Sequence, residues 1–273
     1  MGACMKIGFI GAGNMAHAIL AGIHKSNLVN KSDVFVSNRT KAKLDNLKSE
    51  FSYNVSIDNS YVLKNAKDVV FICVKPQIFD TISSELKKQI TKNQLIVSIM
   101  AGKTIEYLQK SLGTKNVIRV MPNTPSLVGA GVSAVVASKE ATKNKNYNEV
   151  LNVLKGIGEV IETEEKYMNA ITQVSGASPA WIFMMIEALA DGGVECGLPR
   201  ELAYKFAMSA VYGSGKLAIT KYNEDKTHPA VLKDMVTSPA GTTIEGVRVL
   251  EENGFRGAVI DAVLQSYSRS LEL

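Results

Sequence analysis

The sequence has little of the chemistry that metal sites and disulfide scaffolds use: three cysteines, three histidines and one tryptophan among 273 residues. Cys4, Cys73 and Cys196 are odd in number and not paired in spacing, which excludes a disulfide framework and predicts a cytoplasmic, reducing environment. The histidines are scattered, without zinc-ligand spacing and without a Ser/His/Asp pattern. We therefore predict neither a metal site nor a nucleophilic triad.

Long apolar runs and blocks of like charge are also missing. The longest uninterrupted apolar run, at 180–186, is far shorter than the about 20 residues of a membrane span. The net charge is +5, and the basic residues are dispersed rather than clustered. Neither a membrane nor a nucleic acid is therefore an expected partner, although mild positive charge favours an anionic cofactor or substrate.

The strongest motif lies near the start of the chain. A short apolar run at 6–10 has the length of a buried strand, and Gly11-Ala12-Gly13-Asn14-Met15 follows it before an Ala-rich segment with helical spacing. Gly11 permits a tight turn, and Gly13 lets backbone N–H groups reach a pyrophosphate. A glycine-rich turn without a ligand is the alternative, but the order strand, turn and helix favours dinucleotide binding.

The first half of the chain alternates short β-branched runs with helical patterns, which indicates a doubly wound parallel α/β sheet of the Rossmann type. We predict strands at 6–10, 33–37, 69–74, 95–99, 117–121, 132–136 and 159–163, and helices at 14–25, 41–51, 78–89, 105–112 and 146–156. From about residue 164 the strand signals end. We therefore place a domain boundary there. The prediction is a Rossmann domain at 1–163 and an all-helical domain at 164–273, and the motifs below make the first NADP-binding and the second a substrate-binding and dimerisation domain.

The turns after the predicted strands have unusual compositions, and in such a sheet these turns gather at the edge that binds ligands. They include Val74-Lys75-Pro76-Gln77, Met100-Ala101-Gly102 and Met121-Pro122-Asn123-Thr124-Pro125. The turn Ser37-Asn38-Arg39-Thr40 lacks the acid that would hold the ribose hydroxyls of NAD, and it suits a 2′-phosphate. We predict NADP; a solvated loop with a helix cap is the alternative.

One helix of the second half is apolar on every side. Ser178 and Pro179 form a predicted N-cap and first-turn pair, and Gly197 with Pro199 ends the helix. A domain of about 110 residues can hardly enclose such a helix alone, so we predict a subunit interface. An ordinary core helix is the alternative.

A second stretch of small polar residues occupies 236–245. Thr242 and Glu245 fit a capping box, so this stretch is first of all a well-made helix start. A small-residue loop that runs into a helix also presents free N–H groups and hydroxyls, which suit a small carboxylate. The two interpretations are compatible.

These motifs resemble those of the pyrroline-5-carboxylate reductases, NADPH-dependent enzymes that make L-proline, and the likeness runs from Met5 to the C-terminus. Besides the turns above, it rests on Ser175-Gly176-Ala177-Ser178-Pro179-Ala180, Glu187-Ala188-Leu189-Ala190-Asp191-Gly192-Gly193-Val194, Gly197-Leu198-Pro199-Arg200 and Thr237-Ser238-Pro239-Ala240-Gly241-Thr242-Thr243. General dehydrogenases lack the last set. The chain departs from the family at Ala177 (usually Ser or Gly), Trp181 (usually Tyr) and Ala240 (usually Gly).

The resemblance implies a Rossmann domain and a helical domain that interlocks with that of a second copy, giving dimers and sometimes rings of dimers. It places a small-molecule substrate between a nucleotide cleft and a helical domain, with Thr243 as the catalytic residue that hydrogen-bonds the ring nitrogen. The substrate-binding residues are then Ser178, Pro179, Ser238, Gly241, Thr242 and Thr243. The cofactor-binding residues are Gly11, Ala12, Gly13, Asn14, Met15, Ser37, Asn38, Arg39, Thr40, Asn59, Val74, Lys75, Pro76, Ala101 and Asn123, of which Lys75, Pro76 and Ala101 line the nicotinamide pocket.

The expected reaction is hydride transfer from NADPH to C5 of the cyclic imine 1-pyrroline-5-carboxylate, with a proton added to the ring nitrogen. Such a reaction needs few protein acids, because the cofactor carries the chemistry and the protein supplies alignment. Two alternatives stay open: reduction of another cyclic imine or a small keto acid, and an NADP-binding module without turnover.

Overall fold

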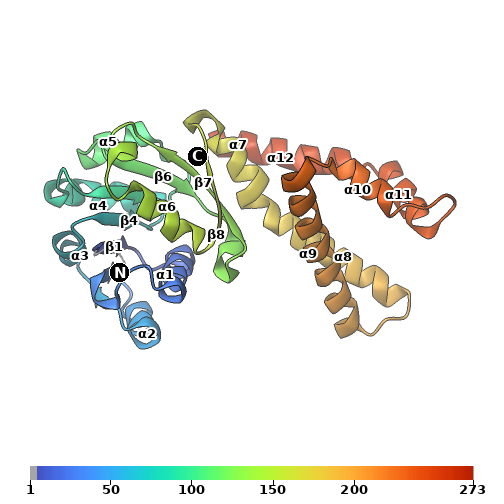
Figure 1. The fold of residues 1–273 in the computed structure, drawn as a ribbon, viewed down its shortest axis with the longest axis horizontal. Helices are drawn as coiled ribbons and strands as arrows, with labels where there is room; N and C mark the ends of the chain where they lie inside the picture. Colours follow the sequence, from blue (N-terminus) through green and yellow to red (C-terminus); the bar gives the residue numbers. More distant parts are fainter. Residues whose placement is uncertain (1–4, 273) are drawn as a thin grey trace. The chain divides into compact units, whose positions relative to one another are not determined.

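The computed structural model describes residues 5–272, which form two compact units; Cys4 lies outside the described residues (Figure 1). The first unit runs to Ala177 and takes back the end of the chain from Ser270, and the second runs from Ser178 to Arg269. The predicted boundary at 163/164 therefore lies earlier than the division between the units. Residues between the two points are helical and pack on the sheet, where Met168 lies against Ala134 and Val136.

The first unit contains one sheet with the order β3-β2-β1-β4-β5-β6-β7-β8. Its strands are β1 (Ile7–Ile10), β2 (Val34–Ser37), β3 (Asn54–Ser56), β4 (Val69–Ile72), β5 (Leu95–Ser98), β6 (Val117–Met121), β7 (Gly131–Ala137) and β8 (Gly158–Glu162). Strands β1, β2, β4 and β5 are buried throughout, which explains why the sequence shows them as continuous apolar runs. The strand order reverses between β1 and β4, and ligands bind at that point in such sheets.

The predicted parallel sheet is confirmed from β3 to β6, but β7 pairs antiparallel with β6. The reason is the length of the connection. A parallel crossover needs a dozen or more residues, whereas β6 and β7 are joined only by a short loop that contains the 3-10 turn η2 (Thr124–Val128). Strand β8 pairs parallel with β7.

Helices cover both faces of the sheet (Figure 1). On one face lie α1 (Asn14–Ser26), α2 (Lys41–Phe51) and α6 (Tyr147–Lys155), and on the other α3 (Asn59–Asn65), α4 (Pro76–Gln89) and α5 (Ile105–Leu112). Phe9 and Phe71 stack at the centre, with ring centroids 4.8 Å apart. The sequence analysis missed β3 and α3, because elements this short show no clear periodicity.

The helix that carries the chain into the second unit does not begin at Ser178. It runs from α7 (Met168–Ile171) through the π-helical turn η5 (Thr172–Ala177) into α8 (Ser178–Glu195). The prediction of Ser178 as an N-cap and Pro179 as the first helical residue is therefore wrong. Proline is tolerated here because it follows the π-helical turn, where the regular ladder of backbone hydrogen bonds is already interrupted.

The second unit is helical, as predicted, and consists of α8, α9 (Arg200–Asp225), α10 (Pro229–Met235), α11 (Thr242–Glu252) and most of α12 (Phe255–Leu271). Gly197, at φ +92°, ends α8 as expected. Helices α8 and α9 meet over the small side chains Ala190, Ala203 and Ala207. Much of the apolar surface of α8 stays exposed, 58% of Phe183 and 66% of Met184. Within residues 5–272, no helix is both long and apolar enough to cross a membrane.

Candidate active site

A cleft of about 260 Å³ opens at the carboxyl edge of the sheet, where the strand order reverses. Its lining comes from the turns after β1, β2 and β4 and from the starts of α2, α3 and α4: Gly11, Ala12, Gly13, Ser37, Asn38, Arg39, Thr40, Lys43, Asn59, Cys73, Val74, Lys75, Ile78 and Ile82. The cleft therefore gathers most of the predicted cofactor residues. Among its lining residues, burial raises the pKa of the Cys73 thiol well above its usual value, so this group stays protonated.

The two glycines of the first turn have separate structural roles. Gly11 has φ +102°, and a Cβ there would lie 2.7 Å from the Cys73 carbonyl oxygen, so both conformation and space require glycine. Gly13 is the N-cap of α1, without a side-chain cap, and no atom lies within 4 Å of the Cβ it lacks. The first N–H groups of α1 thus face open space, as a pyrophosphate requires.

The second turn is shaped by side chains that bond within the protein. The Ser37 hydroxyl is buried and donates to Asn59 Oδ1 at 2.7 Å. Asn38 Oδ1 accepts from the Ala12 N–H at 3.3 Å, and its amide donates to the Thr40 carbonyl at 3.2 Å. The bond to Ala12 ties the turn after β2 to the turn after β1, and the bond to Asn59 ties β2 to the start of α3. Ser37 and Asn38 therefore set the shape of the cleft rather than its charge.

The charge of the cleft comes from three exposed cations, Arg39, Lys43 and Lys75, and none of the residues lining it carries a carboxylate. Lys43 lies in the first turn of α2, which has no acidic residue. A cation there opposes the positive end of the helix, and an anion bound between them removes that conflict. The sequence analysis missed Lys43, although it follows Thr40 by only three positions on the same turn and helix start.

Pro76 and Ala101 lie in a second cavity of the first unit, of about 280 Å³. Its lining also includes Gln77, Asp80, Gly102, Lys103, Asn169, Thr172, Gln173 and Ser270. Lys103 pairs with Asp80 at 2.9 Å, and the Tyr107 hydroxyl donates to Asp80 at 2.5 Å. These two donors hold the pKa of the Asp80 carboxyl below its usual range. The cavity therefore keeps an ion pair next to Pro76 and Ala101, two of the three residues predicted to line the nicotinamide pocket; the third, Lys75, lines the first cleft.

Three other predicted cofactor residues lie outside both cavities. Asn14 and Met15 begin α1, beside the glycine turn. Asn123 follows β6, and its side chain bonds twice within the fold: Oδ1 accepts from the Val132 N–H at 2.9 Å, and Nδ2 donates to the Ser175 carbonyl at 3.1 Å. A contact between these residues and a cofactor stays a prediction.

The predicted substrate loop, 238–243, turns tightly into α11. Gly241 N–H donates to the Ser238 carbonyl at 3.1 Å, and Gly241 rather than Thr242 is the N-cap, with no side-chain cap. The predicted capping box is therefore wrong. The Glu245 carboxylate pairs with Arg248 instead, at 2.5 Å. As a result the first N–H groups of α11 have no side-chain acceptor, which is the condition for binding an anion there.

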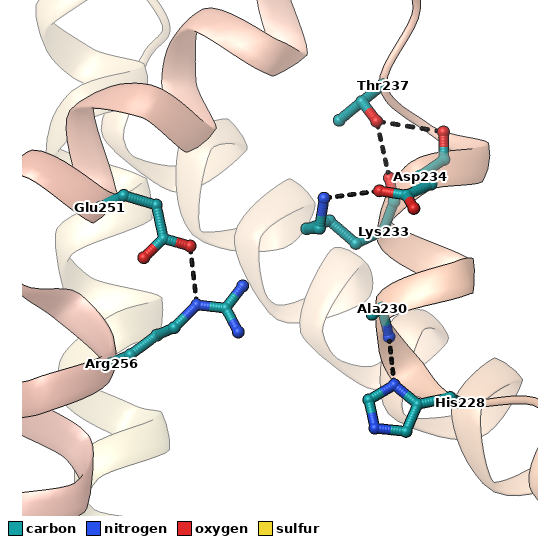
Figure 2. Close-up of polar contacts among 7 residues, drawn as sticks. All are labelled: His228, Ala230, Lys233, Asp234, Thr237, Glu251 and Arg256. Carbon is teal, nitrogen blue, oxygen red and sulfur yellow. Dashed lines mark hydrogen bonds and ion pairs between the residues drawn. The ribbon is translucent and has the colours of Figure 1, made fainter.

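The elements on either side of the loop carry polar contacts of their own (Figure 2). Before it, the Thr237 hydroxyl donates to the carbonyls of Lys233 and Asp234, at 3.2 and 3.0 Å, and so closes the end of α10. After it, Glu251 of α11 pairs with Arg256 of α12 at 2.7 Å. At the start of α10, His228 Nδ1 accepts from the Ala230 N–H at 3.1 Å, which makes this histidine a helix cap.

Comparison with known proteins agrees with this arrangement. Residues 165–273 match the family described as pyrroline-5-carboxylate reductase dimerisation, and residues 6–102 match the family described as NADP oxidoreductase coenzyme F420-dependent. The pyrroline-5-carboxylate reductase of Escherichia coli (strain K12) is 43% identical over 98% of both chains, and that of Arabidopsis thaliana is 40% identical over 98% of this chain and 95% of its own. The chain belongs to the pyrroline-5-carboxylate reductase family.

Solved structures of pyrroline-5-carboxylate reductases share the whole fold. The enzyme from Coxiella burnetii has a TM-score of 0.87 at 32% identity, covering 99% of this chain and 98% of its own. The Plasmodium falciparum pyrroline carboxylate reductase, solved with NADP bound, has a TM-score of 0.85 at 29% identity, with the same coverage. The match to full-length structures agrees with the predicted fold class and with both of its parts.

The cations of the second turn generate the first prediction. Replacing Arg39 by Ala should weaken NADPH binding by about 1.5–3 kcal/mol, the range for a hydrogen bond to a charged group, and leave NADH binding nearly unchanged. Lys43→Met should act in the same direction. Fluorescence titration of both cofactors measures the effect, and Lys41→Ala, a neighbouring lysine that does not line the cleft, is the control. Equal losses for NADPH and NADH would contradict a 2′-phosphate contact.

The second prediction concerns Ala240, which has φ +54° in the predicted substrate loop. A left-handed conformation costs an alanine roughly 1–2 kcal/mol. Glycine avoids this cost, but it loses more conformational entropy on folding, which cancels part of the gain. Ala240→Gly should therefore stabilise the protein by about 0.5–1 kcal/mol in urea denaturation. Ala42→Gly, on an ordinary helical backbone in α2, should do the opposite. A less stable Ala240→Gly protein would show that the loop is not strained.

Proposed function

We propose that this protein reduces 1-pyrroline-5-carboxylate to L-proline with NADPH as the hydride donor. The observation that carries the proposal is that one chain of this family has two places suited to an anion. One is a long cationic cleft without a lining carboxylate, and the other is the uncapped start of α11 behind a tight loop of small residues. The first suits a dinucleotide with a 2′-phosphate, and the second suits a small carboxylate.

The residues of the cleft fit NADPH. The open space at Gly13 is proposed to admit the pyrophosphate. Arg39 and Lys43, which line the cleft, are proposed to bind a 2′-phosphate, and Ile78 and Ile82 are proposed as an apolar surface for the adenine. When bound, the cofactor supplies a hydride to C5 of the imine. Lys75 and Pro76, which join β4 to α4, are the residues proposed to direct its nicotinamide end.

The residues of the loop are proposed to hold and polarise the substrate. Backbone N–H groups at the start of α11 bind the carboxylate, with Ser238, Gly241 and Thr242 shaping the turn; Ser178 and Pro179 are further proposed substrate contacts. The Thr243 hydroxyl is exposed and bonds to no other residue within 5–272. It is therefore available to the ring nitrogen, whose bond to the hydroxyl strengthens as the hydride arrives and the nitrogen becomes an amine.

We also propose that the protein acts as a homodimer. An apolar groove of about 620 Å³ lies within the second unit, between Trp181, Met184 and Met185 of α8 and the facing side chains of α11 and α12. The opposing side chains are Leu250, Phe255, Ala258, Val259 and Ala262. This surface falls within the residues that match a dimerisation family, so a second copy is its proposed occupant. We further propose that the dimers assemble into rings and that the protein is located in the cytoplasm. The cytoplasmic location agrees with the free thiols of Cys73 and Cys196.

One assay separates the proposal from its alternatives. Purified protein is mixed with NADPH and 1-pyrroline-5-carboxylate, and in parallel with other cyclic imines and small keto acids, while NADPH oxidation and product are followed. Formation of proline at the highest kcat/KM supports the proposal. Preference for another substrate would favour the related reductase, and NADPH binding without turnover on any substrate would favour a non-catalytic module.

Thr243→Val generates a prediction on turnover. Valine keeps the β-branched shape and removes only the hydroxyl, so the backbone N–H groups that hold the carboxylate are retained. Turnover should fall about tenfold to a hundredfold, the effect of one hydrogen bond to a developing charge, and NADPH binding should not change. Thr142→Val, which removes a hydroxyl bonded to Lys139 in the first unit, should keep wild-type kinetics. Normal turnover of folded Thr243→Val would leave Thr243 with a structural role only.

Met185→Asp generates a prediction on assembly. A carboxylate in the apolar groove would be desolvated by a second copy without a partner charge, so the variant should be monomeric or insoluble, and inactive. Met185→Leu, which conserves volume, should assemble normally. Light scattering and activity measure both variants. A monomeric, fully active wild-type protein would contradict the proposed dimer.

A further inference from the structure

The chain passes from its first unit to its second through the π-helical turn Thr172–Ala177. Regular α-helix precedes the turn in α7 and follows it in α8. π-helical turns inside α-helices are rare and frequently mark functional sites. The turn also ends at Ala177, where the first unit ends, and hinges lie at such positions at the ends of elements.

Pro179, at the start of α8, removes the α-helical donor of one backbone carbonyl of the turn. Proline has no N–H, so the carbonyl four residues earlier, that of Ser175, cannot accept an α-helical bond. The Asn123 amide supplies a donor from outside the helix, with Nδ2 3.1 Å from the Ser175 oxygen. Asn123 is itself fixed to the sheet, because its Oδ1 accepts from the Val132 N–H next to the start of β7.

Other side chains of the turn satisfy carbonyls of the preceding helix. The hydroxyls of Thr172 and Ser175 donate to the carbonyls of Met168 and Ile171, at 2.7 and 2.9 Å, and the Gln173 amide donates to that of Asn169 at 3.3 Å. Such bonds, from a side chain to the carbonyl four residues earlier, tend to bend helices. All three come from within the helix, whereas the Asn123 bond is a tether between the turn and the sheet edge.

We propose that the turn is the hinge between the two units and that Asn123 is a positioning residue that latches it. The role in catalysis rests on the proposed function: the cleft for NADPH belongs to the first unit and the loop with Thr243 belongs to the second. The chain passes from the first unit to the second where α8 begins, and it returns within α12. A latched hinge restricts the directions that α8 takes as it leaves the sheet. Asn123 thus acts on turnover through Ser175 and α8, without contact with the reacting atoms.

The test compares Asn123→Asp with Asn116→Asp, which lie at opposite ends of β6. Aspartate keeps the acceptor at Oδ1 and removes the amide donor. In Asn123→Asp the lost bond is the one to Ser175; in Asn116→Asp it is a bond to the Lys92 carbonyl, at 2.8 Å. We expect hydrogen exchange at 172–180 to rise about tenfold in Asn123→Asp and not in the control, since an unsatisfied carbonyl favours local opening by this order. Turnover should fall about tenfold, with the Kd for NADPH within about twofold of wild type.

A second variant tests the pairing with Pro179. In the double variant Asn123→Asp/Pro179→Ala, the alanine N–H gives the Ser175 carbonyl a helical donor, so exchange at 172–180 should return to within about threefold of wild type. This variant also serves if Asn123→Asp alone does not fold. Because hydrogen exchange does not depend on the substrate, the hinge is tested even if the protein fails to reduce 1-pyrroline-5-carboxylate.

Three results would overturn the inference. The first is unchanged exchange at 172–180 in Asn123→Asp, which would show that the bond does not hold the turn. The second is a Kd for NADPH raised tenfold or more with normal turnover at saturation, which would make Asn123 a direct cofactor contact. The third is a double variant that stays as exposed to exchange as the single one.

Discussion

Gly11 lies so close to the backbone of Cys73 that any side chain at this position would meet the Cys73 carbonyl, and its φ of +102° is one that other residues rarely adopt. The contact joins the ends of β1 and β4, the pair between which the strand order reverses. It also lets the chain turn at once into α1, so that the helix N-terminus opens onto the sheet edge. The turn after β2 is tied to the same point, through Asn38 and the Ala12 N–H. The cleft at the carboxyl edge of the sheet is the space left by these close backbone contacts.

The helices differ in whether a side chain caps their first backbone N–H groups. Helices α3, α5 and α10 are capped by the side chains of Asp58, Thr104 and His228. Helices α1 and α11 begin at glycine and have no such cap. A missing cap alone does not define a binding site, because α6 and α9 also lack one. The small residues before α1 and α11 make the difference, since they let a ligand approach the backbone N–H groups.

The two units differ in how they cover apolar surface. The sheet of the first unit is enclosed by helices on both faces within one chain. In the second unit, α8 meets α9 over alanines and still exposes more than half of Phe183 and Met184. Burial of a comparable surface by a second copy is the physical reason for a dimer in this family of folds. The apolar groove between α8 and the last two helices is the part of that surface with a defined shape.

The sequence by itself determined the features that depend on neighbouring residues: the glycine turn at Gly11, the buried strands, the absence of an acid after β2 and the apolar helix α8. Local patterns specify these, because period, turn geometry and composition are properties of short segments. Only the tertiary structure decided which polar side chains form hydrogen bonds within the protein. Ser37 bonds to Asn59, and Asn123 bonds to Ser175, across distances in sequence that no local pattern reports.

The same reason explains the predictions that were wrong. Ser178 and Pro179 have the composition of a helix start, but the packing of Met168 on the sheet extends the helix backwards through a π-helical turn. Thr242 and Glu245 have the spacing of a capping box, but Glu245 pairs with Arg248, and Gly241 takes the cap position. Lys43 lines the cleft because α2 begins directly after the turn that follows β2, which places the first turn of the helix at the edge of the sheet. In each case a local signal was outweighed by a contact that exists only once the sheet and the helices have come together.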